Sequence, residues 1–139
     1  MTVQYINNVK NAMIEVALIV VRLSTQSLTA VDPNGNDIYT MVISTGKAST
    51  PTPTGIFHIG HQYSKVDFIG DTWQLKGMKN VMCLTGAGIT DNSYCLHPLP
   101  PGAGSLGIPR SLGCIRMHHR DAKWLFERST VGTFVRIQK

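Results

Sequence analysis

One cysteine stands where nucleophilic catalysis would be possible. Cys114 follows Gly113 in the segment Arg110–Arg116 (RSLGCIR), which places its thiol on a tight turn. Backbone N–H groups on such a turn can point at a reacting oxygen. The two flanking arginines, Arg110 and Arg116, surround the thiol with positive charge, which favours the thiolate over the thiol. The segment therefore predicts a reactive cysteine, whereas the alternative is an ordinary buried thiol.

A cysteine nucleophile needs a base, and His97 is the candidate. It lies 17 positions before Cys114, across a loop rich in proline and glycine. The chain has five histidines, so a chance pairing is the alternative. Asp91 and Asp121 are the nearest carboxylates that could orient His97. Asp121 is also expected in the first turn of a helix, where the helix dipole favours an acidic residue.

The other histidines predict no metal site. His58 and His61 are three apart in an expected strand and would point to opposite faces, and neither this pair nor His118–His119 has the spacing of a zinc-binding helix. His118 and His119 are expected to be solvated near the start of a helix. The sequence thus indicates neither a metal nor a cofactor.

The two remaining cysteines leave two interpretations open. Cys83 and Cys95 are either buried thiols or a disulfide pair that leaves one thiol free. Three cysteines are too few for a disulfide-based scaffold.

The composition bounds the class of protein. The 139 residues suit one domain, and 42% hydrophobic residues provide a core. The net charge of +5 is compatible with anionic partners, but 15% charged residues without a Lys/Arg run disfavour a nucleic-acid-binding protein. No paired carboxylates suggest a glycosidase, and Gly86–Gly88 lacks the lysine of a phosphate loop. The apolar segment Met13–Val21 is too short to span a bilayer and lacks the features of a secretory signal, so we expect either that the protein is not exported by a classical signal or that the chain is trimmed.

The pattern of apolar residues predicts a mainly β fold with one late helix. A meander of short strands is expected first, followed by a stiff loop with two prolines at Thr50–Gly55. The expected strands are Val16–Leu23, Ser27–Val31, Ile38–Ser44, Gly55–Gly60, Trp73–Leu75, Val81–Leu84 and Phe134–Ile137. The i, i+3, i+4 spacing of apolar residues predicts a helix over residues 118–129. Residues 98–109 read as an irregular loop.

Three blocks of this sequence, taken together and in this order, resemble the YkuD-type L,D-transpeptidase catalytic domain, a β-rich fold that remodels bacterial peptidoglycan. They are Ser44–Lys47, then Thr50–Phe57, and then His97 with its Gly/Pro loop and Ser111–Arg116, followed by Asp121–Lys123 and Val131–Thr133. The resemblance covers residues 16–139 and implies a sandwich-like or barrel-like arrangement of the strands. Residues 1–15 show no clear period and are expected to be a lead-in.

The resemblance implies a role for each residue of the site. Cys114 would be the acylated nucleophile and His97 its base. The loop Ser111–Gly113 would shape the nucleophile and provide the oxyanion hole through its backbone N–H groups. Arg116 would bind substrate.

Two residues depart from the family pattern. Leu112 stands where the family usually has a histidine, which removes any role of that side chain but keeps its backbone donor. Pro98 follows the base where glycine is common, and its carbonyl can still accept a hydrogen bond from the imidazole.

The activity implied by the resemblance is acyl transfer on peptidoglycan stem peptides. An amine acceptor would give a crosslink, water would give an L,D-carboxypeptidase, and a carbapenem would acylate the cysteine. The implied location is extracytoplasmic. The first alternative is a non-catalytic peptidoglycan-binding module on the same fold, against which an intact Cys114 and His97 argue. The second is a thiol hydrolase of the papain or NlpC/P60 kind, in which the cysteine precedes the histidine, whereas here the histidine comes first.

Overall fold

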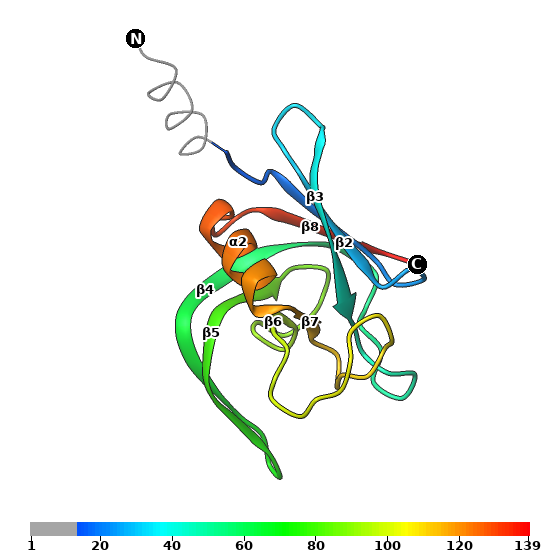
Figure 1. The fold of residues 1–139 in the computed structure, drawn as a ribbon, viewed down its shortest axis with the longest axis vertical. Helices are drawn as coiled ribbons and strands as arrows, with labels where there is room; N and C mark the ends of the chain where they lie inside the picture. Colours follow the sequence, from blue (N-terminus) through cyan, green and yellow to red (C-terminus); the bar gives the residue numbers. More distant parts are fainter. Residues whose placement is uncertain (1–13) are drawn as a thin grey trace.

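Eight strands join edge to edge in one closed barrel, in the order β1-β2-β3-β7-β6-β5-β4-β8 (Figure 1). The computed structural model describes residues 14–139; most of the expected lead-in therefore lies outside the described residues. The strands are β1 (Leu18–Arg22), β2 (Ser27–Val31), β3 (Asp37–Ser44), β4 (Gly55–Ile69), β5 (Gln74–Thr85), β6 (Cys95–Pro98), β7 (Ile115–Met117) and β8 (Phe134–Gln138). The mainly β fold predicted from the sequence is confirmed, and it takes the form of a barrel.

The first three strands form the predicted antiparallel meander. The turn between β2 and β3 is stabilised by Asp32, whose carboxylate accepts hydrogen bonds from the N–H groups of Asn34 (3.0 Å) and Asn36 (2.9 Å). The barrel closes where β1 pairs in parallel with β8, at the other end of the chain. The alternating apolar residues of these strands, such as Ile19 and Val135, are fully buried in the core.

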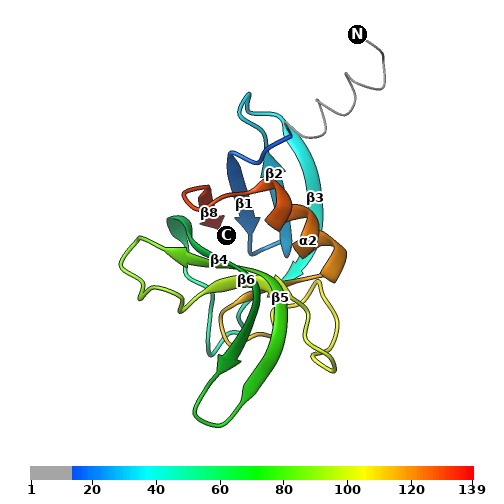
Figure 2. The same ribbon diagram turned by 90° about the vertical axis from the view of Figure 1, so that its left-hand side faces the viewer.

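Strands β4 and β5 are much longer than the short strands predicted there. They pair from His58–Thr85 out to Ile69–Gln74, and β5 joins the two short strands expected at Trp73 and Val81. The outer part of this hairpin, residues 65–79, extends beyond the barrel as an arm (Figures 1 and 2). Most arm residues are half-buried or exposed. Polar and apolar residues alternate only in short runs such as residues 65–68, which are too short to predict strands of this length.

Two short strands, β6 and β7, were not predicted. They run parallel to each other in the middle of the sheet, with His97 paired to Arg116 and Pro98 to Met117. Strands of four and three residues carry too few positions to show a period. The irregular loop expected from Pro98 therefore begins one residue later, at Leu99.

The predicted helix is confirmed as α2 (His119–Arg128), which packs beside β5 and β6 (Figure 2). Ala122 and Leu125 are fully buried and carry its apolar face. Among residues 14–139, no helix is both long and apolar enough to cross a membrane.

Candidate active site

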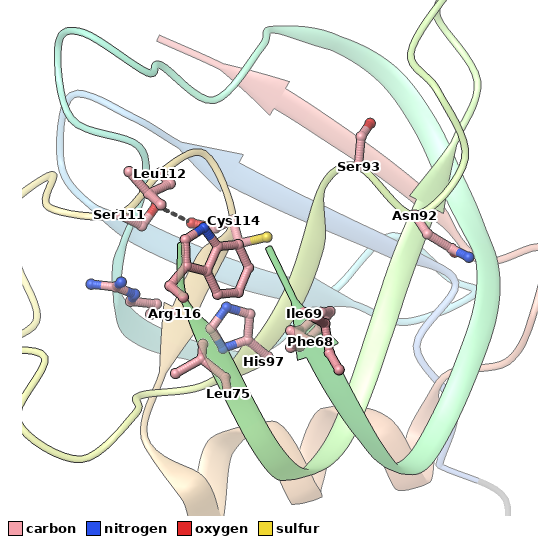
Figure 3. Close-up of a pocket in the computed structure, with 11 residues that line it drawn as sticks. Phe68, Ile69, Leu75, Asn92, Ser93, His97, Ser111, Leu112, Cys114 and Arg116 are labelled. Atoms are coloured by element: carbon pink, nitrogen blue, oxygen red, sulfur yellow. Dashed lines mark hydrogen bonds between the residues drawn. The ribbon is translucent and has the colours of Figure 1, made fainter. Parts of the chain in front are cut away.

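The parallel pairing of β6 and β7 brings His97 and Cys114 to the same face of the sheet. Leu96 and Ile115 are paired and fully buried in the barrel core. Because successive side chains of a strand alternate between faces, the residues on either side of this pair point away from that core. These residues include the base, the thiol and Arg116. All three line one pocket outside the barrel (Figure 3).

Hydrogen bonds from a distant loop hold the backbone that carries the thiol. Thr52, in the predicted stiff loop, is buried; its hydroxyl donates to the Gly113 carbonyl (2.7 Å) and accepts from the Gly46 N–H (2.9 Å). The Thr50 hydroxyl donates to the Ser111 carbonyl (3.1 Å). The Thr50–Gly55 segment is therefore a brace for the nucleophile loop.

Inside that loop, the Ser111 side chain closes a local network. Its Oγ accepts from the Gly113 N–H (3.0 Å) and donates to the Cys114 carbonyl (2.5 Å). The Ser111 N–H donates to the Thr45 carbonyl (3.0 Å). Of the three amides predicted to form an oxyanion hole, two are thus engaged within the protein. The third, the Leu112 N–H, has no partner among residues 14–139.

Gly113 has a conformation that other residues rarely adopt. Its φ is +130°, and a Cβ at this position would lie 2.8 Å from Cε1 of Tyr94. This glycine lets the chain turn into Cys114 while the Tyr94 ring packs against it.

His97 is buried and held in one orientation by its neighbour in sequence. Its Nδ1 lies 2.7 Å from the Pro98 carbonyl oxygen. Since a carbonyl only accepts, Nδ1 carries the proton and Nε2 is the basic nitrogen. Burial lowers the pKa of His97 to about 4, the Pro98 hydrogen bond opposes this, and the Arg116 charge adds to it. The imidazole is therefore neutral at pH 7.

Neither candidate carboxylate orients His97. Asp91 accepts a hydrogen bond from Thr85, and Asp121 accepts one from the Tyr39 hydroxyl. Asp121 is buried, so its position in the first turn of α2 does more than complement the helix dipole. The orienting group is the Pro98 carbonyl, which the sequence analysis had named as a possible acceptor.

The environment of Cys114 differs from the expected electropositive turn. Burial raises the pKa of the Cys114 thiol; the Cys95 N–H, which donates to Sγ at 3.3 Å, and the Arg116 charge lower it by less. Arg110 is exposed, and its side chain passes beside Gly104 outside the pocket. The expectation that two arginines favour the thiolate is therefore wrong, because burial outweighs the one arginine that lies close.

The pocket around these groups has a volume of about 440 Å³. Arg116 lies at one end and Asn92 and Ser93 lie at the other, with Cys114 and His97 between them (Figure 3). Within the described chain, the buried Nε of Arg116 has no hydrogen-bond partner. The guanidinium places a positive charge at this end of the pocket, which suits a carboxylate.

One wall of the pocket comes from residues that the sequence analysis missed. They are apolar side chains of the hairpin arm: Phe68, Ile69, Trp73 and Leu75. Trp73 is 44% exposed, which is unusual for a tryptophan. The sequence contains this aromatic residue, but only the long β4–β5 pairing places it near a thiol 41 positions away. Leu112, which is 56% exposed, lines the same pocket.

The remaining histidines and cysteines also have defined places. His118 and His119 are exposed at the start of α2, as predicted. In the part of the chain described by the structure, no three His, Cys, Asp or Glu side chains form a group that could hold a metal ion. Cys83 and Cys95 form a disulfide, and Cys114 is free.

Comparison with known proteins identifies the family and agrees with the fold. The family model of the L,D-transpeptidase catalytic domain (YkuD) matches residues 17–137. The chain therefore belongs to this family. It is 29% identical over 119 residues to L,D-transpeptidase 2 of Mycobacterium tuberculosis, covering 82% of this chain and 29% of that protein.

Solved structures show the same relationship. An LD transpeptidase in complex with imipenem superposes with a TM-score of 0.74 at 27% identity, over 86% of this chain and 57% of that one. L,D-transpeptidase 1 of Mycobacterium tuberculosis gives 0.66 at 25% identity, over 88% and 61%. The chain thus spans only part of each of these relatives.

Proposed function

We propose that this protein is a cysteine-dependent L,D-transpeptidase that acts on peptidoglycan stem peptides through an acyl-enzyme on Cys114. The observation that carries the proposal is the hydrogen bond between His97 Nδ1 and the Pro98 carbonyl. It leaves Nε2 free to accept a proton in the pocket that holds the thiol. Burial keeps both groups neutral at rest, so the thiol has to be activated by proton transfer during the attack.

In the acylation step, His97 Nε2 takes the Cys114 proton as sulfur attacks the carbonyl that joins an L-centre to the terminal D-residue. The carbonyl π electrons move to oxygen, where the Leu112 N–H is the donor that we assign to the oxyanion. When the tetrahedral intermediate collapses, the C–N bond breaks and His97 protonates the leaving nitrogen. The products are a thioester on Cys114 and a free D-amino acid.

In the second step, an amine of another stem peptide attacks the thioester. His97 takes a proton from that amine, a new amide forms, and the sulfur leaves as a thiolate that His97 protonates. Water in place of the amine would release the stem peptide, which is the carboxypeptidase outcome.

The shape of the pocket supports a peptide substrate. The positive charge of Arg116 at one end suits a carboxylate of the stem peptide, and the amide and hydroxyl of Asn92 and Ser93 at the other end suit polar backbone groups. The apolar side chains of the arm form one wall of this pocket. Because peptidoglycan lies outside the cytoplasm, we place the reaction there.

Intact-mass analysis with a stem tetrapeptide tests this function. We expect the wild-type protein to gain the mass of the tetrapeptide minus that of the released D-amino acid, and imipenem to add its own mass at the same cysteine. Cys114→Ala should fold equally well by circular dichroism and show neither adduct. Release of D-residue or crosslinking by this variant would contradict the mechanism. Peptide binding by the wild-type protein without any adduct would instead favour the non-catalytic binding module.

A further inference from the structure

Three cysteines of this chain lie side by side on one face of the sheet. Cys83 of β5 pairs directly with Cys95 of β6, and their sulfurs are bonded. The β6–β7 register, continued back by one residue from Leu96 and Ile115, places Cys114 beside Cys95. Cys114 packs against the small apolar cluster that contains the disulfide. The middle cysteine therefore has a sulfur-bearing neighbour on each side.

The contacts of the thiol agree with this register. Cys114 Sγ accepts a hydrogen bond from the Cys95 N–H at 3.3 Å, so the thiol lies directly against the backbone of the disulfide-bonded residue. Neighbouring strands are about 4.8 Å apart. Cα atoms joined by a disulfide are usually about 4.4–6.8 Å apart. Cys95 can consequently form a disulfide with either neighbour without a change in the strand order.

We propose that Cys114 exchanges with the Cys83–Cys95 disulfide and that this reaction reversibly withdraws the nucleophile. The Cys114 thiolate attacks the Cys95 sulfur, a Cys95–Cys114 bond forms, the Cys83–Cys95 bond breaks, and the electron pair leaves on Cys83, which takes up a proton. One disulfide is exchanged for another, so no external oxidant or reductant is consumed. The consequence for activity rests on the proposed function of Cys114.

The site thus offers the thiol two partners along β6. His97 lies two residues beyond Cys95 on the same strand and on the same face. A thiol that passes its proton to His97 attacks a bound substrate, whereas one turned towards Cys95 attacks the disulfide. Substrate in the pocket and disulfide exchange therefore compete for the same sulfur, and a bound acyl group blocks the exchange.

Disulfide mapping on the wild-type protein tests the exchange. The protein is incubated at pH 8.5 without reductant, quenched in acid, and digested with pepsin at low pH, where thiolates are too scarce to rearrange further. We expect a Cys95–Cys114 linked peptide together with free Cys83, and at least a tenfold lower yield after a matched incubation at pH 6.5. Cys114→Ser and imipenem-treated protein are the controls, and both should keep only the Cys83–Cys95 link. Wild-type protein that keeps only this link after prolonged incubation would overturn the proposal.

A second variant tests the effect on activity. Cys83→Ser leaves Cys95 and Cys114 as free thiols, and diamide should join them. We expect acylation by imipenem to fall at least tenfold and to return after dithiothreitol. Unchanged acylation after diamide treatment would overturn the proposal that a Cys95–Cys114 disulfide withdraws the nucleophile. If reduced Cys83→Ser protein and wild-type protein both fail to be acylated, the failure lies in the proposed function, because disulfide mapping reads the exchange independently.

Discussion

The variant His97→Ala tests whether Cys114 is activated by proton transfer to His97 during the attack or is already a thiolate in the resting enzyme. In the wild-type protein the pKa of His97 is about 4, so the base is neutral and competent at every pH above that value. Burial raises the pKa of Cys114, so the thiol keeps its proton at pH 7. We therefore expect wild-type acylation by imipenem to change little between pH 5 and 8 and to fall as the pH drops through about 4.

The size of the loss follows from what the variant can still do. Without a base, only pre-formed thiolate reacts, and an ordinary thiol with a pKa of about 8.5 is about 3% ionised at pH 7. Burial makes the ionised fraction of Cys114 smaller still. Since a general base contributes about 10²–10⁴-fold, His97→Ala should be acylated at least about a hundredfold more slowly at pH 7. Below the thiol pKa, its rate should rise about tenfold per pH unit, so the gap closes in alkali.

Stopped-flow or mass-resolved acylation rates from about pH 3.5 to 9, a range that brackets the His97 pKa of about 4, provide the measurement. His118→Ala is the matched control, because His118 is exposed and its side chain makes no capping hydrogen bond with α2. A loss below about tenfold at pH 7 would refute the assignment of the base. A variant profile parallel to that of the wild type would refute the claim that the thiol is neutral at rest.

The same residue also provides a stability control. His97 takes up a proton with a pKa near 6.5 when unfolded but only near 4 when folded, so the unfolded state binds more protons between these values. The free energy of unfolding of the wild-type protein should therefore decrease as the pH falls from 6.5 to 4, by about 3 kcal/mol in total. His97→Ala should lack this decrease, as measured by urea unfolding at pH 7 and pH 4.5.

Two further substitutions test the support around the thiol. Thr52→Val removes a buried hydroxyl and leaves the Gly113 carbonyl and the Gly46 N–H without partners, which should lower the free energy of unfolding by about 2–4 kcal/mol and slow acylation. The exposed Thr54→Val should change the free energy of unfolding by less than about 0.5 kcal/mol. Equal effects of the two variants in urea unfolding would show that Thr52 does not brace the nucleophile loop. Cys83→Ala removes the disulfide to Cys95, which spans 12 positions, and the loop entropy predicts a loss of about 3 kcal/mol in urea unfolding relative to the oxidised wild-type protein. Reduced wild type should show a similar loss, and a loss below about 1 kcal/mol would mean that the disulfide adds little to stability.

The parts of the fold predicted correctly are those with a clear local pattern. The meander is marked by β-branched runs and the Asp32–Asn36 turn, and α2 by its i, i+3, i+4 spacing. The sequence shows no comparable signal for β6 and β7, and in the arm it predicted only the short strand Trp73–Leu75. The arm is exposed on much of its surface, and the two short strands owe their existence to neighbours that are distant in sequence. These strands form because they pair with neighbouring strands in the folded protein, which the local sequence pattern does not show.

The residue types in the sequence predicted which side chains meet in the site, but not how the site shifts their pKa values. Cys114 and His97 do line one pocket, although 17 positions separate them. A lowered pKa of the Cys114 thiol was predicted from the nearby arginines. The pKa is raised instead, mainly by burial, which only the packed structure determines. The orienting group for His97 is the Pro98 main-chain carbonyl, which the family resemblance predicted as an acceptor, whereas the two carboxylates suggested by residue type do not contact the imidazole.

The two departures from the family pattern, Pro98 and Leu112, are compatible with the proposed chemistry because both residues contribute through main-chain groups. At Pro98 the contact with His97 is made by the carbonyl oxygen, which proline retains. The backbone N–H that proline lacks takes no part in this contact. At Leu112 the contribution that we assign is the backbone N–H, which is the same for leucine and histidine. The Leu112 side chain is more than half exposed at the pocket and adds apolar surface to a site whose arm is already apolar. The substitutions thus alter the surface that a substrate meets, while the proton transfer that we propose from Cys114 to His97 relies on main-chain groups that both residues preserve.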